Sequence, residues 1–100
     1  MEKNNKEVYI GQYGRMRELF LKYNAPKTYR EMKKSKELIP YLKHIDKIAA
    51  EMEEDLAQRM ARAEGLTDEV KETDPQEWIG LMNNYRMCAR EIVIKDIIEV

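Results

Sequence analysis

The chain has few of the residues on which covalent and metal-dependent chemistry depends. Cysteine, serine and histidine each occur once in its 100 residues, as Cys88, Ser35 and His44. A lone thiol forms no internal disulfide and no cysteine-rich zinc site. Nucleophilic catalysis needs a nucleophile beside an oriented base, and the sequence contains no Gly-x-Ser-x-Gly elbow. It also contains no Glu-x-x-His pair, the motif with which helical bundles bind metal ions. We therefore expect no catalytic residues, no metal site, no cofactor and no enzymatic activity.

Turn residues and long apolar runs are also scarce. Four glycines and three prolines are too few for an all-β chain, which needs a turn about every 8–12 residues. No window approaches the ~20 apolar residues that a membrane-spanning helix requires, and residues 1–7 lack the apolar core of a signal peptide. We expect a helical, cytoplasmic protein with no membrane contact.

Charged residues are abundant, at 37% of the chain against roughly 25% in an average domain. This excess is typical of long helices with solvent-facing sides. Apolar residues recur at intervals of three and four, and this spacing predicts helices over 12–23, with Tyr13, Met16, Phe20 and Tyr23 on one face, and over 26–34, with Tyr29 and Met32 inward.

A third helix is predicted over 36–64, with Ser35 as its N-cap and Gly65 as its stop. Thr67 is expected to cap a short helix ending at Glu72. Asp74 and Pro75 then form a strong start signal for a last helix over 75–98. The predicted fold class is all-α: two short N-terminal helices, then a long antiparallel helical hairpin (36–64 and 75–98) with a short connecting helix. Residues 10–100 are expected to form a single domain behind a flexible polar tail, 1–9.

The end of the last helix is apolar on nearly every side, and a terminal strand over 92–98 is the competing interpretation. A helix of this kind is buried on more than one side. A hairpin about 40 Å long is also longer than a compact domain of this size is wide. Its apolar faces must therefore be covered by the N-terminal helices or by a second copy of the chain. We therefore predict a homodimer, with an oligomer or partner interface at Ile92, Val93, Ile94, Ile97 and Ile98.

Charge is divided between the two halves of the chain. Residues 1–47 hold twelve Lys and Arg against six acids, whereas residues 48–100 hold six against thirteen. Phosphate contacts in protein–DNA complexes come chiefly from Lys and Arg. The candidate nucleic-acid contacts are Arg15, Arg17, Lys22, Arg30, Lys33, Lys34 and Lys36. The alternative is that the two oppositely charged halves dock on each other or are simply solvated.

Gly11 and Gly14 form the only close pair of glycines, and they match neither phosphate-binding loop pattern. A flexible entrance to the first helix is the simpler interpretation.

Several blocks of sequence, in order, resemble the transposon-encoded TnpV family. They are Ile10 to Arg17, Ser35 to Leu42 continuing through Ile45 to Lys47, Ala63 to Thr67, and Glu77-Trp78 through Met82-Asn83-Asn84 to Arg90-Glu91-Ile92-Val93. Lys36 stands where glycine is expected in the family, and Tyr41 where histidine is frequent.

The resemblance implies a setting in mobile elements and no established activity. Together with the basic, tyrosine-containing first half of the chain, this setting favours an accessory protein that binds element DNA. The alternative is a protein-interaction or dimerisation module that contacts a recombinase or another element protein without touching DNA.

Overall fold

The computed structural model describes residues 10–100, so the predicted tail over 1–9 lies outside the described residues. Every regular element of the described chain is a helix. Its elements, in order, are α2 (Gln12–Asn24), α3 (Pro26–Lys34), α4 (Leu38–Ala63), α5 (Asp68–Thr73), α6 (Pro75–Val93) and η1 (Ile94–Ile98), a π-helical continuation of α6. The predicted all-α class is confirmed.

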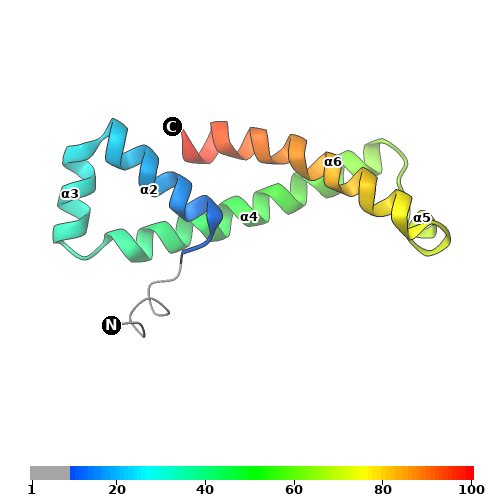
Figure 1. The fold of residues 1–100 in the computed structure, drawn as a ribbon, viewed down its shortest axis with the longest axis horizontal. Coiled ribbons are helices and arrows are strands. Elements are labelled where there is room, and N and C mark those ends of the chain that lie inside the picture. The colour runs from blue at the N-terminus through cyan, green and yellow to red at the C-terminus, as the bar shows by residue number, and fades with distance from the viewer. Residues whose placement is uncertain (1–9) are drawn as a thin grey trace.

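The helices form an elongated molecule measuring 52 × 31 × 16 Å (Figure 1). The two long helices, α4 and α6, run antiparallel, and α5 lies in the turn between them. At the other end α2 and α3 fold back over the first half of α4, and η1 lies against α2 (Figure 1). The predicted hairpin is therefore confirmed, and the N-terminal helices cover one half of it.

The boundary before α4 corrects the prediction. The helix begins at Leu38 rather than Lys36, because Lys36 has a positive φ of 67° that no right-handed helix accommodates. Ser35 ends α3 instead of starting α4, and its hydroxyl donates to the carbonyl of Met32 at 3.1 Å. The amide of Glu37 also donates to Met32, at 3.0 Å. This is the Schellman motif, with a lysine where glycine is usual.

The other boundaries follow the local signals. Gly65, with a φ of 80°, ends α4 in a second Schellman motif, in which Leu66 N–H donates to the Ala61 carbonyl at 2.9 Å. The carboxylate of Asp74 accepts the amide of Glu77 at 3.2 Å and so caps α6. Thr67 occupies the N-cap of α5, but its side chain makes no capping bond. Residues 92–98 are helical, which excludes the strand interpretation.

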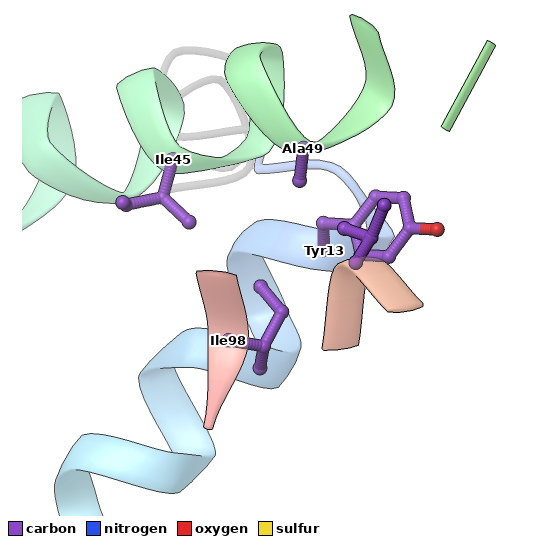
Figure 2. Packing of buried hydrophobic residues seen from close by; sticks show 5 residues of the cluster. Tyr13, Ile45, Ala49 and Ile98 are labelled. Atoms are coloured by element: carbon purple, nitrogen blue, oxygen red, sulfur yellow. The ribbon is translucent and has the colours of Figure 1, made fainter. Parts of the chain in front are cut away.

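The core divides along α4. Over its first half, α4 packs against large side chains from α2, from the end of α6 and from η1. Figure 2 shows Ile45 and Ala49 of α4 facing Tyr13 of α2 and Ile98 of η1. Over its second half only α6 covers α4. The buried residues there are Ala57, Ala61, Ala89 and Met82.

Candidate nucleic-acid interface and neighbouring cavities

The outer face of α3 is basic. Its apolar side chains, Tyr29 and Met32, pack inward on the cluster around Leu38 and Leu42, as predicted. A spacing of three and four residues places Lys27, Arg30 and Lys34 on the opposite face, where all three are exposed. An amphipathic helix thus presents its cations to solvent.

This face forms the centre of what we call the basic end, residues 22–37. It contains six cations against the two acids Glu31 and Glu37: Lys22, Lys27, Arg30, Lys33, Lys34 and Lys36. All six cations are exposed. Lys27 was absent from the predicted contacts, although its spacing from Arg30 and Lys34 would have placed it on this face.

The opposite end of the molecule, residues 62–77, is the acidic end. It carries six acids against Arg62 and Lys71. Each end therefore holds four net charges, positive at the α3 end and negative at the α5 end, along a molecule 52 Å in length. A polyanion would be attracted to one end and repelled by the other.

Two predicted DNA contacts are engaged within the protein. Arg15 pairs with Glu18 at 2.9 Å. Arg17 donates to the carbonyls of Ile98 at 2.7 Å and Val100 at 3.1 Å and to the hydroxyl of Tyr41 at 3.0 Å. The Arg17 guanidinium thus fastens η1 to α2 and is not available to a phosphate in this conformation.

The predicted partner interface is also divided. Val93 is fully buried and Ile98 is 2% exposed, because α2, α4 and η1 enclose both side chains in the chain's own core. Ile94 and Ile97 are partly buried beside them, and Ile92 is 37% exposed. The apolar sequence at the C-terminal end is therefore accounted for mainly by contacts within one chain. The homodimer stays a prediction.

The close glycines serve tight packing. The amide of Gly14 donates to Asp46 Oδ1 of α4 at 2.9 Å, and a Cβ on Gly11 would lie 2.3 Å from the same carboxylate. A Cβ on Gly14 would lie 2.9 Å from the carbonyl oxygen of Leu42. Gly11 is the N-cap of α2 and offers no side-chain bond, so Asp46 caps α2 from another helix.

A polar network joins α2, α4 and α6 near mid-molecule. The hydroxyl of Tyr13 donates to Glu53 of α4, and the Arg90 guanidinium of α6 lies 5.3 Å from the centre of the Tyr13 ring. Burial of the phenol and its hydrogen bond to a carboxylate raise the pKa of Tyr13 above its usual value of 10.0. The Arg90 side chain also donates to Gln12 at 3.0 Å.

Two concavities lie away from α3. An apolar groove of about 380 Å³ runs between α2 and η1, lined by Leu19, Phe20, Tyr23, Ile94 and Ile98 among others. A polar pocket of about 590 Å³ lies between α4, α5 and α6 at the acidic end. Its lining includes Arg62, Lys71, Arg86 and the chain's single tryptophan, Trp78.

Two searches over residues 10–100 gave negative results. No helix in that range is long and apolar enough to cross a membrane. No cluster of three or more His, Cys, Asp or Glu side chains in that range has the geometry to hold a metal ion. His44 and Cys88 are both exposed, on α4 and α6 respectively.

Comparison with known proteins assigns the family. Residues 1–98 match the family described as transposon-encoded protein TnpV, which extends over nearly the whole chain. No curated protein and no solved structure matches the chain. The family match agrees with the blocks at Ile10–Arg17 and Glu77–Val93, and the chain belongs to the transposon-encoded TnpV family.

Proposed function

We propose that this protein is a non-catalytic accessory protein of a mobile element that binds DNA through its basic end. The observation that carries the proposal is the outer face of α3, where Lys27, Arg30 and Lys34 are exposed on one side of a helix that packs its apolar side inward. Lys22, Lys33 and Lys36 extend this surface. Neutralising DNA phosphates releases counterions, and this release drives binding without base contacts.

The family supports the same proposal through its setting. A transposon-encoded protein is made in a cell that carries the element's DNA, so this ligand is at hand. The acidic end supports a defined orientation, because its four net negative charges repel the duplex that the basic end attracts.

The test is a DNA titration followed by fluorescence anisotropy at several salt concentrations. With about six phosphate contacts, affinity should fall by ~10³ between about 50 and 200 mM salt. The variant Arg30→Glu/Lys34→Glu should abolish binding. Its matched control, Arg59→Glu/Lys95→Glu, changes net charge by the same amount at two exposed positions outside the basic end and should bind almost normally. Undetectable or salt-independent binding, or equal losses in both variants, would refute the proposal.

Self-association is the second candidate function, favoured by the opposite charges of the two ends. The basic end lies beside the apolar groove that includes Leu19, and Ile79 is 51% exposed near the acidic end. A second copy would place its acidic end and Ile79 against this groove in a head-to-tail contact.

Sedimentation in the DNA-binding buffer separates the two candidates. Head-to-tail association predicts a mass that rises with protein concentration and falls with salt. Ile79→Lys should then restore the monomer mass, whereas Met87→Lys, at a still more exposed position of α6, should not. A constant monomer mass at all concentrations would exclude this candidate.

A further inference from the structure

The polar pocket at the acidic end concentrates positive charge in the negative half of the chain. Residues 48–100 contain six Lys and Arg against thirteen acids. Three of these six cations, Arg62, Lys71 and Arg86, line this one pocket. They come from α4, α5 and α6 respectively, so the tertiary fold brings them together.

The three cations differ in how they are held. Arg86 of α6 donates to Glu54 of α4 at 3.3 Å, and Lys71 of α5 lies 4.8 Å from the centre of the Trp78 ring. Arg62 has no ion-pair partner within residues 10–100. Arg86 and Lys71 are therefore positioned by the fold, and the Arg62 guanidinium has its full hydrogen-bonding capacity free.

The shape and the remaining lining define what the pocket would hold. Its volume, about 590 Å³, falls in the range of small-molecule sites and is far larger than a single inorganic ion needs. The buried side chains of Ala61 and Met82 supply an apolar floor. Gln58, Thr67 and Asp68 add groups that bond hydroxyls.

We propose that this pocket binds a small phosphomonoester that carries hydroxyl groups, with Arg62 and Arg86 on the phosphate. Guanidinium groups pair with phosphate oxygens through two parallel hydrogen bonds, and such charge-assisted bonds are stronger than neutral ones. Lys71 adds a third positive charge. The organic part of the ligand would cover Ala61 and Met82, with its hydroxyls toward Asp68 and Thr67.

A long nucleic acid is a poor occupant of the same pocket. The pocket belongs to the acidic end, where six acids outnumber two cations, and a polyanion would meet this field over its whole length. A small dianion meets only the local lining, in which Arg62, Lys71 and Arg86 outnumber the two carboxylates, Glu54 and Asp68. This site is therefore separate from the DNA surface proposed at α3, and either proposal can fail without the other.

The pocket contains its own reporter. Trp78 is the chain's only tryptophan and lines the pocket beside Lys71. The experiment titrates the whole protein, in phosphate-free buffer of fixed ionic strength, with adenosine monophosphate, adenosine and inorganic phosphate. Tryptophan fluorescence is recorded, and calorimetry provides an independent affinity.

The expected result is a saturable signal for adenosine monophosphate, weaker binding of phosphate, and no response to adenosine. Arg62→Gln should weaken the binding of adenosine monophosphate about tenfold or more, because it removes a charge-assisted contact. Arg59→Gln is the matched control: it lies on the same helix, pairs with Asp55 at 3.0 Å and should bind normally.

Three outcomes would overturn the proposal. They are a failure of adenosine monophosphate to saturate, equal effects of the two arginine variants, and equal affinity for phosphate and its ester. Both variants are at exposed positions, and unfolding curves recorded beside the titrations show whether each is folded.

Discussion

The two ends of α4 are built on different principles. Around its first half, large side chains such as Leu42 and Ile45 are covered by α2, α3 and η1. Around its second half, a single helix packs against small side chains, Ala57 and Ala61, and a polar pocket remains open beside them. Next to the basic end, α4 therefore packs in a filled apolar core. Toward the acidic end, α4 and α6 approach closely through small side chains, and a cavity remains beside them. Packing stability and small-molecule binding are expected to be concentrated at opposite ends of α4.

Deleting one buried side chain at each end tests this contrast with the largest effect. Leu42→Ala should lower the free energy of unfolding by about 3–4 kcal/mol, because Leu42 is fully buried among several elements that cannot collapse around a cavity. Met82→Ala should cost less, about 2–3 kcal/mol, because Met82 borders the open pocket and water can enter the space. Urea unfolding measures both. An equal or larger loss for Met82→Ala would contradict the contrast.

Two helical glycines provide the next test. Gly14→Ala should destabilise the protein by about 2 kcal/mol, because its Cβ would meet Ile10 at 2.1 Å and the Leu42 carbonyl at 2.9 Å. Gly80→Ala has open space around the new methyl group and should stabilise by about 1 kcal/mol through helix propensity. Thermal unfolding gives both values. If both changes stabilise, the close packing at Gly14 does not exist in solution.

The network at mid-molecule predicts a pH effect. The pKa of Tyr13 is raised by burial and by Glu53, so the folded state holds the phenol proton more tightly than the unfolded state does. The resulting stability is complete below the unfolded value near 10 and is lost as pH rises above it. Tyr13→Phe should cost about 1 kcal/mol at pH 7 and flatten this alkaline decline. Denaturant curves from pH 7 to about pH 11 would show it, and parallel declines in the two proteins would exclude the Tyr13 contribution.

The two Schellman motifs supply the smallest effect. Lys36 and Gly65 occupy the same left-handed position at the ends of α3 and α4, with φ of 67° and 80°. Lys36→Gly should stabilise by about 0.5–1 kcal/mol because glycine lacks the Cβ that disfavours this conformation, whereas Gly65→Ala should destabilise by about as much. Lys36→Asn should keep much of this gain in stability, because asparagine tolerates a positive φ, and it also removes the positive charge. A loss of DNA binding in this stabilised variant would therefore come from the lost charge and not from the backbone. A destabilised Lys36→Gly would contradict the assigned geometry.

Local signals in the sequence were sufficient for most of the fold. Ala25-Pro26 and Asp74-Pro75 mark helix boundaries by steric and capping rules that act within a few residues, and both boundaries lie where these rules place them. The start of α4 was misplaced because Ser35 suits either end of a helix. The positive φ of Lys36 is not predictable from the sequence, because lysine rarely adopts a positive φ.

The candidate sites were less predictable, because they depend on contacts between distant residues. The exposed face of α3 follows from spacing alone. The binding of Arg17 to the Ile98 carbonyl spans 81 residues, and nothing local distinguishes Arg17 from its exposed neighbours. Likewise, Arg62 and Arg86 reach one pocket only through the register of α4 against α6. Only charge counting in the acidic half would have marked them as unusual.

The cap that Asp46 provides to α2 also has a consequence for the order of folding. The carboxylate lies 32 residues beyond the Gly14 amide that it accepts, so α2 is synthesised well before its own N-terminus can be capped. A 13-residue helix without a cap is marginal in water. On a ribosome, therefore, the segment that precedes the basic surface should remain unstructured until α4 has emerged. The basic end would become a defined surface only when the long hairpin is already being formed.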